Sequence, residues 1–339
     1  MAKQVKLIDI ASKLGVSTVT VSKALSNQKG VSEELRAKII ELADEMGYKQ
    51  PSAVRRENHK QKEYQIGVLI QQTFLEKYDS FYWLMYQRVN TQALGYGCFC
   101  QLEVVTKEME LEGTLPKIVT EHRVDGLLTI GQMEEVFLHN LKFNSGIPVV
   151  YMDYTDGLPT TDAVVSDSYY GAYHLTNYLL SMGHREIAFV GTIQGTPSIT
   201  DRFFGYCKAL LDRGFTPRMD WQINDRRKGE GIIDLIRLPD QMPTAFFCNC
   251  DLAAAVLVQQ LEEKGYRVPE DISVAGFDNY LHPGLCNVRI TTYEVDQIAM
   301  AKQAVKILLK RMNRDEYPYG THAVEGHLVI KDSVISREG

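Results

Sequence analysis

The chain has 339 residues, of which 45% are hydrophobic and 24% charged, and its formal net charge is −6. This composition is typical of a water-soluble protein large enough for two or three domains. No apolar run approaches the roughly 18 residues of a membrane-spanning helix, so we expect no membrane segment. The first ten residues lack a secretory signal pattern and six cysteines are too few for a disulfide framework, which predicts a cytoplasmic protein with reduced thiols.

The charge is unevenly divided along the chain. Residues 1–63 hold 12 Lys and Arg against 8 Asp and Glu, a net of +4, whereas the remainder has a net of −10. A basic N-terminal module on an acidic body is typical of a nucleic-acid binder whose body has another task. An imbalance of this size is weak evidence without a motif. Whether the module binds nucleic acid therefore depends on the motifs among the N-terminal residues.

The N-terminal residues contain three short helical patterns. Apolar residues recur at helical spacing over 7–14 and stop at Gly15, a residue suited to a helix end or tight turn. A second pattern, 18–25, follows the N-cap residue Ser17, and a third runs over 32–47. Two short helices that are joined by a glycine-containing turn and covered by a third helix form a helix-turn-helix.

The second of these helices has the composition of a major-groove reader. Short hydroxyls and a cation reach phosphates and base edges without carrying negative charge toward DNA. The alternative is a small helical subdomain with a solvated hydroxyl face, which the whole pattern disfavours. The residues predicted to contact DNA here are Ser17, Thr18, Val19, Thr20, Ser22, Lys23 and Asn27.

The same residues resemble the N-terminal signature of the LacI/GalR family of bacterial transcription regulators. The resemblance implies a homodimer that places two recognition helices in successive major grooves of a near-palindromic operator, with Thr18, Val19 and Lys23 at base-contacting positions. It rests on three stretches, Ile8-Asp9-Ile10-Ala11-x-x-Leu14-Gly15-Val16-Ser17-x-x-Thr20-Val21-Ser22-Lys23-x-Leu25, then Val31-Ser32-x-x-x-Arg36, and then Met46-Gly47-Tyr48.

The linker departs from the family pattern. It places Arg55 and Arg56 near the family's arginine position, but Glu57 follows instead of the family's leucine. An apolar wedge offsets the cost of unstacking a base step, and a glutamate cannot act as one. We therefore expect residues 50–63 to form a basic hinge that contacts the minor groove differently, through Arg55 and Arg56, or that orders only against phosphate.

From residue 64 onward, short apolar runs alternate with helical patterns. Near-continuous apolar strands that alternate with helices indicate parallel sheets covered on both faces, and two such sets predict two similar lobes. The predicted strands are 64–70, 98–104, 126–130, 148–151, 163–166, 187–191, 244–248 and 272–277. The predicted helices lie near 81–94, 108–122, 133–143, 169–182, 200–213, 229–236 and 251–264.

The resemblance extends through this body and implies an α/β fold, a two-lobed periplasmic-binding-protein-like body with parallel sheets, preceded by the small all-α helix-turn-helix domain. A helix over 294–312 would belong with the first lobe, and strands near 326–336 with the second. The chain would cross between lobes near Thr160, Thr291 and Thr321. The predicted domains are 1–49 for DNA binding, 50–63 for the hinge and 64–339 for effector binding and dimerisation, with an N-lobe of about 64–160 and 292–320 and a C-lobe of about 161–291 and 321–339.

Ligands of such lobes bind at the carboxyl ends of the strands, in the cleft between the lobes. Charged planar groups hold sugar hydroxyls bidentately and aromatic rings stack on sugar faces; interlobe salt bridges and loop caps are the alternative roles. Cys250 replaces the Asn of a family Asn-Asp pair, which leaves Asn249 one place early. The predicted effector-binding residues are Phe81, Tyr82, Asp167, Ser198, Arg202, Asn249, Asp251 and Asp278.

No catalytic motif emerges, since the chain has no phosphate loop, no nucleophile elbow and no His-Glu-x-x-His, and we predict no enzyme activity, cofactor or metal site. We expect a ligand-responsive DNA-binding repressor whose partners are double-stranded operator DNA, a second copy of the chain and a small-molecule effector. A carbohydrate is the favoured effector, although purines and sugar phosphates suit similar clefts. The alternatives are a solute-binding protein for sugar transport and a cytosolic sugar-binding enzyme.

Overall fold

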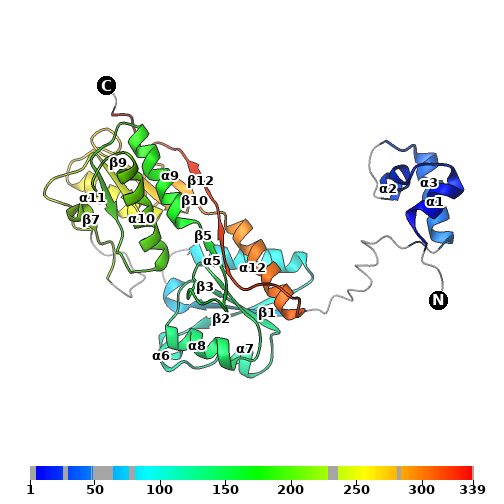
Figure 1. Ribbon diagram of the computed structural model, residues 1–339. Coiled ribbons are helices and arrows are strands. Elements are labelled where there is room, and N and C mark those ends of the chain that lie inside the picture. Colours follow the sequence, from blue (N-terminus) through cyan, green and yellow to red (C-terminus); the bar gives the residue numbers. More distant parts are fainter. Residues whose placement is uncertain are drawn as a thin grey trace. The chain divides into compact units, whose positions relative to one another are not determined.

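The structure is a computed structural model of the chain (Figure 1). Two compact units, Met1–Lys62 and Glu63–Gly339, divide the chain close to the predicted start of the body. No helix in the part that the structure describes is long and apolar enough to cross a bilayer. The described residues are 5–25, 30–46, 48, 64–75, 81–227, 236–280 and 284–337, so the predicted hinge and all but the last residue of the predicted helix at 229–236 lie outside them.

The described residues of the first unit form three helices, as the sequence predicts. They are α1 (Leu7–Leu14), α2 (Thr18–Leu25) and α3 (Glu33–Glu45). Gly15 ends α1 with a φ of 63°, in the left-handed region that a glycine enters without steric cost. The buried apolar side chains of the three helices form one small core, made of Ile10, Ala11, Val21, Ala24, Ile39 and Ala43.

The second unit contains two six-stranded sheets. Among the residues that the structure describes, all strand pairs are parallel except that of β10 and β12, which is antiparallel. The first sheet has the order β11 (Thr321–Val324), β5 (Asp162–Ser166), β4 (Val149–Met152), β3 (Gly126–Ile130), β1 (Gln65–Gln71), β2 (Phe99–Val105). The second has the order β12 (His327–Val329), β10 (Thr291–Glu294), β9 (Ser273–Asp278), β8 (Ala245–Cys248), β6 (Ile187–Val190), β7 (Gln222–Ile223).

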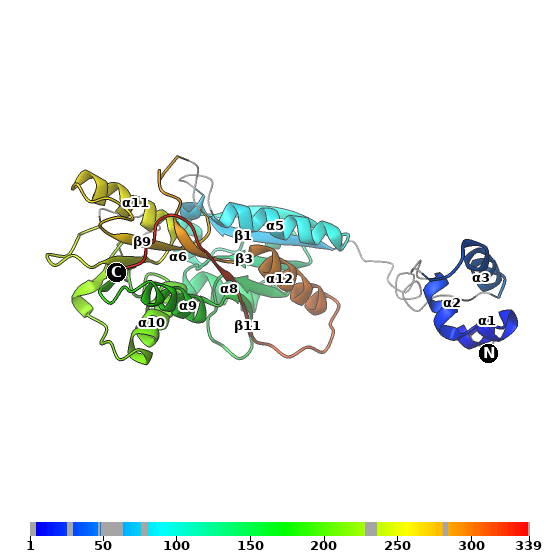
Figure 2. The same ribbon diagram turned by 90° about the horizontal axis from the view of Figure 1, so that it is seen from above.

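Helices cover both faces of each sheet (Figures 1 and 2). In the first sheet, Val68 and Ile70 of β1 pack in the core that contains α5 (Phe81–Gly95) and α12 (Gln297–Met312), whereas Leu69 packs on the other side with α7 (Lys117–Thr120) and α8 (Glu135–Asn144). This alternation follows from the two-residue period of a strand. The remaining helices are η1 (Gln72–Phe74), α6 (Lys107–Glu112), α9 (Ser168–Ser181), α10 (Pro197–Asp212), η2 (Met219–Trp221) and α11 (Asp251–Glu263).

Sheet membership corrects the predicted lobe boundaries. Both β5 and β11 belong to the first sheet, whereas the sequence analysis assigns them to the second lobe. The chain therefore crosses after β5, between β10 and α12, and after β11, so that the predicted crossings near Thr160, Thr291 and Thr321 all lie a few residues too early. The apolar pattern of a buried strand indicates burial but not which sheet the strand joins. Hereafter the N-lobe is the first sheet with α5 to α8 and α12, and the C-lobe is the second sheet with α9 to α11.

Helix α12 packs on α5 of the N-lobe, and β12 pairs with β10 of the C-lobe. Helix α12 begins at the crossing between lobes, where the Asp296 carboxylate accepts a hydrogen bond from Ala299 N at 2.8 Å. Its other end meets the start of the unit, because the Tyr64 hydroxyl donates to Asn313 Oδ1 at 2.7 Å. Near that end Arg311 forms an ion pair with the buried Asp162 of β5. Helix α12 is thus capped by its own Asp296 at the crossing and fixed to the N-lobe at its other end.

Candidate functional site

The first unit presents α2 on a fixed support. Ser17 caps the helix, because its Oγ accepts a hydrogen bond from Thr20 N at 3.1 Å and lies 2.8 Å from Thr20 Oγ1. At the other end, Arg36 of α3 donates from Nη1 to the Ala24 carbonyl at 3.1 Å. These two contacts fix both ends of α2 within the unit, and the burial of Val21 and Ala24 sets which face is left outside.

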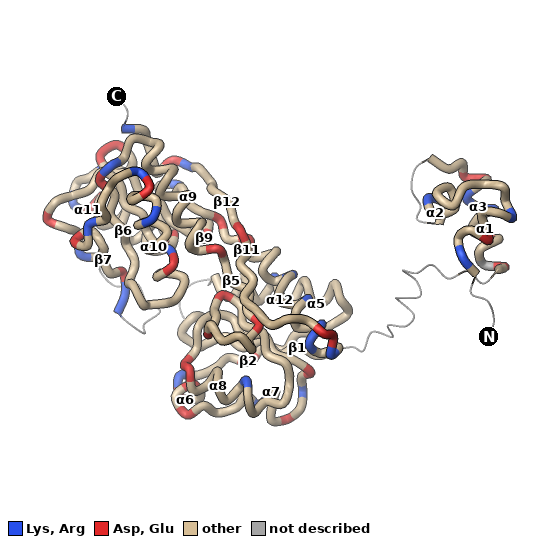
Figure 3. Tube along the Cα trace, in the orientation of Figure 1, with Lys and Arg blue, Asp and Glu red and all other residues tan. Residues whose placement is uncertain are grey.

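The outward face of α2 carries most of the side chains predicted to contact DNA. Thr18, Val19, Ser22 and Lys23 are exposed, with 61% of the Val19 surface accessible. Thr20 is half-buried beside the Ser17 cap. The helix carries Lys23 and no acidic residue, whereas α3 has two glutamates in its first turn (Figure 3). The predicted contacts Asn27, Arg55 and Arg56 lie outside the described residues.

The second unit has a buried polar cluster where the two lobes meet, and its centre is Arg202 of α10. The Arg202 side chain is only 7% exposed, and its Nη2 lies 3.0 Å from Asp278 Oδ1. Nη1 donates to the Asn249 carbonyl at 2.5 Å and Nε to Ser168 Oγ at 3.3 Å. The guanidinium also lies over the Phe277 ring, 3.9 Å from its centre. All these partners belong to the C-lobe, so the position of Arg202 is fixed within its own lobe.

Asp278 ends β9 in an unusual backbone conformation. Its φ is 94° and that of Asn279 is 49°, both in a region that residues other than glycine rarely adopt. Asp251 fixes the turn, because its Oδ2 accepts a hydrogen bond from Tyr280 N at 2.9 Å. Gly276 is required at this point, because a Cβ there would lie 2.1 Å from Asp251 Oδ1. The turn points the Asp278 carboxylate at Arg202.

A second charged pair follows β7. Asp225 is completely buried, and its carboxylate accepts from Thr192 N and Thr192 Oγ1, both at 2.9 Å, and from Asn249 Nδ2 at 2.7 Å. Arg226 adds an ion pair, with Nη2 at 2.7 Å from Asp225 Oδ2. Burial alone would raise the pKa of Asp225, yet the Arg226 charge and these hydrogen bonds hold the pKa below its usual value.

The N-lobe contributes a tyrosine and a carboxylate. The Tyr82 hydroxyl, at the start of α5, donates to Asp153 Oδ2 at 3.0 Å. Asp153 directly follows β4 and has a φ of 61°. Beside this pair the Phe81 ring lies 6.0 Å from the ring of Tyr280, which belongs to the C-lobe turn. The two lobes therefore meet through aromatic rings next to the polar cluster.

The pKa shifts show that the two lobes form one electrostatic site. Burial raises the pKa of Asp153 to about 6, with Arg202 opposing the rise and Asp278 adding to it. Burial, followed by the Asp153 carboxylate, raises the pKa of Tyr82. Burial also raises the pKa of Asp278, against the opposing charges of Arg202 and Arg226. Asp153 thus belongs to the N-lobe but responds to charges of the C-lobe.

The structure brings together four of the predicted effector residues, Phe81, Tyr82, Arg202 and Asp278, and the others make the following contacts within the protein. Asn249 is buried, and its side-chain amide group donates to Val190 O and Asp225. Asp251 is buried under the Asp278 turn. The Asp167 carboxylate caps α9 at Tyr170 N, and Ser198 Oγ lies 2.8 Å from Thr196 Oγ1 at the start of α10. Asn249 and Asp251 thus position their neighbours.

Sequence reasoning missed four residues of the cluster. Asp153 directly follows a predicted strand, so the rule that ligands bind at the carboxyl ends of strands could have found it. Asp225 and Arg226 follow a strand of two residues, which is too short to leave a pattern. Tyr280 is brought to the site by the turn after β9.

Comparisons with known proteins agree with both units. The family described as bacterial regulatory proteins, lacI family, matches residues 6–51, and the periplasmic binding protein-like domain matches residues 176–334. The repressor PurR of Aliivibrio salmonicida is 29% identical over 334 residues, which cover 96% of this chain and 98% of that protein. PurR of Pasteurella multocida is 29% identical over 337 residues, which cover 97% of this chain and 98% of that protein.

Solved structures share the fold. The transcriptional regulator CelR in complex with cellobiose has a TM-score of 0.67 and 20% sequence identity, covering 97% of this chain and all of that one. A lac repressor dimer bound to operator and an anti-inducer has a TM-score of 0.66 and 22% identity, covering 98% of this chain and all of that one. A helix-turn-helix unit followed by a two-lobed binding domain is the domain composition of DNA-binding transcription regulators, and the nearly full-length relatives are named repressors. The chain thus carries a lacI-type helix-turn-helix domain and a periplasmic binding protein-like domain, and it is similar over nearly its whole length to repressors of that type.

Proposed function

We propose that the protein is a cytoplasmic repressor whose α2 helix reads operator DNA and whose operator affinity changes when a small molecule binds between the lobes. The observation that carries this proposal is the buried cluster to which both lobes contribute, with Tyr82 and Asp153 on one side and Arg202 and Asp278 on the other. A polar molecule that contacts both sides changes the free-energy difference between open and closed lobes. The nearly full-length match to proteins named repressors supports the assignment.

The coupling between ligand and operator follows from thermodynamics. A ligand shifts the equilibrium between two conformations only by its difference in affinity for them. A hundredfold change in operator affinity needs about 2.7 kcal/mol of coupling free energy. The basic residues 50–63 would carry the change from the body to the DNA-reading unit and would add phosphate contacts of their own.

The DNA-reading role is tested by Lys23→Ala in the full chain. If Lys23 contacts a base, the substitution weakens binding to an operator selected from a random pool by about 1–3 kcal/mol and leaves random DNA nearly unaffected. Lys208→Ala, which removes a half-exposed lysine of the body, is the matched control. Equal weakening on both DNAs would reduce Lys23 to a phosphate contact. Failure of the wild type to select any operator would favour a solute-binding role.

A carbohydrate remains the favoured effector. Arg202 and Asp278 offer a donor and an acceptor 3.0 Å apart, which suits adjacent hydroxyls, and Phe81 and Tyr280 provide aromatic faces beside them. The CelR structure with cellobiose shows that this fold holds a sugar in another protein. A thermal-shift screen of sugars and nucleobases tests the class, since a ligand at 100 times its dissociation constant stabilises the native state by about 2.7 kcal/mol. A screen without a carbohydrate hit would reject the sugar, and turnover of a bound sugar would reveal an enzyme.

We also propose that two copies associate through the edge of the N-lobe. The edge strand β2 exposes 54% of Phe99, and the neighbouring α5 exposes 51% of Leu94. Large apolar side chains exposed on neighbouring elements are candidates for an association surface. Light scattering of the full chain should give twice the chain mass of 38.4 kDa, and Phe99→Lys with Leu94→Lys should shift it toward the monomer. Phe143→Lys, at an exposed position on α8, is the control.

A further inference from the structure

Arg226 is held by one edge of its guanidinium. Its Nε lies 3.1 Å and its Nη2 2.7 Å from Asp225 Oδ2, which fixes the plane of the group. Nη2 also faces Asn249 Oδ1 at 3.3 Å and the Cys250 sulfur at 3.9 Å. Because Asp225 is itself bound by Thr192 and Asn249, the arginine cannot swing away from this position without leaving a buried carboxylate less compensated.

The opposite edge of the same group is open. Among the residues that the structure describes, none accepts a hydrogen bond from Arg226 Nη1, and the side chain is 15% exposed. Arg226 follows β7 at the carboxyl edge of the second sheet, and it shares Asn249 with the interlobe cluster, because Arg226 Nη2 faces Asn249 Oδ1 while Arg202 Nη1 donates to the Asn249 carbonyl. The open edge therefore lies at the interlobe site and not on a remote surface.

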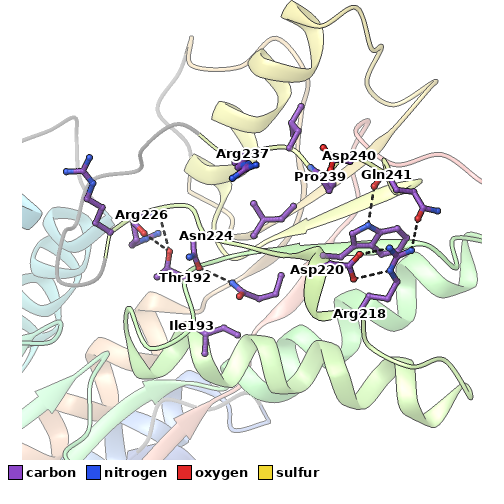
Figure 4. A pocket seen from close by; sticks show the side chains of 15 residues that line it. Thr192, Ile193, Arg218, Asp220, Asn224, Arg226, Arg237, Pro239, Asp240 and Gln241 are labelled. Atoms are coloured by element: carbon purple, nitrogen blue, oxygen red, sulfur yellow. Dashed lines mark hydrogen bonds and ion pairs between the residues drawn. The ribbon is translucent and has the colours of Figure 1, made fainter.

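A groove of about 1040 Å³ begins at this edge and runs along β7. Figure 4 shows Thr192 and Arg226 at one end and Arg218 and Asp220 at the other, with Arg237 between them. Four arginines and two aspartates line the groove, so basic side chains predominate. Arg218 is paired with Asp220 and stacked on Trp221, which leaves the excess of positive charge nearer to Arg226.

The chemistry of the open edge selects a class of ligand. A guanidinium edge offers donors and no acceptor, whereas a neutral sugar hydroxyl both donates and accepts. A phosphate or carboxylate has only acceptors and is bound by arginine in a planar geometry with stronger, charge-assisted bonds. We propose that the effector carries an anionic group, a phosphate or a carboxylate, that binds Arg226 Nη1 at the mouth of this groove while the rest of the molecule lies between the lobes. This rests on the proposed function, which supplies the interlobe site.

The experiment measures binding of inorganic phosphate, glucose 6-phosphate, gluconate and glucose to the full chain by calorimetry and thermal shift. We expect phosphate and at least one anionic sugar to raise the melting temperature, and we expect Arg226→Gln to weaken their binding by tenfold or more while binding of glucose, if any, changes less. Preference for glucose 6-phosphate over gluconate identifies phosphate, and the reverse order identifies carboxylate. Absence of any anion-dependent shift in the wild type, or an equal shift in Arg226→Gln, overturns the proposal.

Two further variants separate binding from folding. Arg226→Gln leaves Asp225 buried with fewer partners, so the double variant Asp225→Asn with Arg226→Gln removes both charges together and should fold with the wild-type circular dichroism spectrum. If this variant folds and still binds phosphate like the wild type, the proposal is wrong. Arg218→Gln, in the same groove but paired with Asp220, should bind phosphate like the wild type.

The proposed function is tested separately by operator binding without ligand. This measurement uses the wild type, because operator selection depends on the first unit whereas anion binding depends on the body. Anion binding in a protein that selects no operator would contradict the repressor assignment and leave the anion site standing. Operator binding without anion binding would support the repressor assignment and contradict the anion site.

Discussion

The two sides of the interlobe site are built differently. On the C-lobe side each charge has a partner within its own lobe, Arg202 with Asp278 and Arg226 with Asp225. On the N-lobe side Asp153 accepts a hydrogen bond from Tyr82, but the cation that lowers its pKa, Arg202, belongs to the other lobe. The C-lobe is thus arranged before the lobes meet, whereas the N-lobe carboxylate is compensated only across the interface. Ionisation of Asp153 and closure of the lobes are therefore linked.

The largest expected effect comes from breaking the C-lobe pair. Arg202→Met leaves Asp278 buried without its cation and removes the donors to Ser168 and to the Asn249 carbonyl. Breaking one side of a buried ion pair costs about 3–5 kcal/mol of unfolding free energy. Urea unfolding followed by circular dichroism measures the loss.

The control for this substitution lies in the same lobe. Arg289 and Asp332 form an ion pair whose side chains are 74% and 54% exposed. Because solvent screens such a pair, Arg289→Met should cost less than about 1 kcal/mol. Equal losses in the two variants would show that Arg202 is not held as described.

Asp153→Asn tests the N-lobe side through its pH dependence. The native-state pKa of about 6 lies above the ordinary value of 3.8, so the folded protein binds this proton more tightly than the unfolded chain. Below pH 3.8 this protonation contributes its full stabilisation, at most about 3 kcal/mol of unfolding free energy. This contribution is lost as the pH rises through 6. Asp153→Asn should remove this decline from unfolding curves measured between pH 4 and pH 6.

Asp332→Asn is the matched control for the pH series. The Arg289 side chain holds the pKa of Asp332 below its usual value, so this exposed carboxylate contributes stability that is lost as the pH falls. Its removal leaves the Asp153 decline in place. If the decline persists in Asp153→Asn, another group is responsible and the link to lobe closure fails.

Gly276→Ala tests whether the C-lobe turn is pre-arranged. The new Cβ would lie 2.1 Å from Asp251 Oδ1, so Asp251 must move and release Tyr280 N. Overpacking of this kind costs about 1–3 kcal/mol, and ligand binding should weaken as the turn shifts. Gly95→Ala, where a Cβ meets nothing within 4 Å, should be neutral or slightly stabilising in a helix. A Gly276→Ala protein as stable as Gly95→Ala would show a flexible turn.

The smallest effect is expected for Tyr82→Phe. It removes one hydrogen bond, to Asp153, at a cost of about 0.5–1.5 kcal/mol. Because this bond lowers the pKa of Asp153, its loss should raise that pKa further and move the pH transition upward. Tyr173→Phe, whose hydroxyl contacts Asp212 on the surface, should leave the transition unchanged. A downward movement in Tyr82→Phe would contradict the geometry.

Much of the fold could be predicted from the sequence because its signals are local. The end of α1 at Gly15 and the capping of α2 by Ser17 follow from residues within one turn of each helix. The assignment of β5 to a sheet could not be predicted in this way, because it depends on hydrogen bonds to β4 and to β11, which lies more than 150 residues further along the chain.

The site residues were predictable only where the residue type and its motif indicate a single structural role. Arg202 and Asp278 follow clear motifs and lie together in the interlobe cluster, where they form an ion pair. The carboxylates of Asp167 and Asp251 also follow or precede strands and helices, yet they bind backbone N–H groups, and sequence alone does not separate a cap from a ligand contact. The basic charge of residues 1–63 is likewise concentrated outside α2, since residues 49–62 hold Lys49, Arg55, Arg56, Lys60 and Lys62.

The position of α12, between the crossing and the start of the unit, has a mechanical consequence. Its 16 residues form a rod of about 24 Å, with one end at the crossing between the lobes and the other at Tyr64, the first described residue after the basic hinge. A rigid lever of this length turns a small tilt at the crossing into a larger displacement at the point where the chain enters the body. The output of the binding site is therefore a movement of an anchor point, which needs no unfolding of the lobe that carries it.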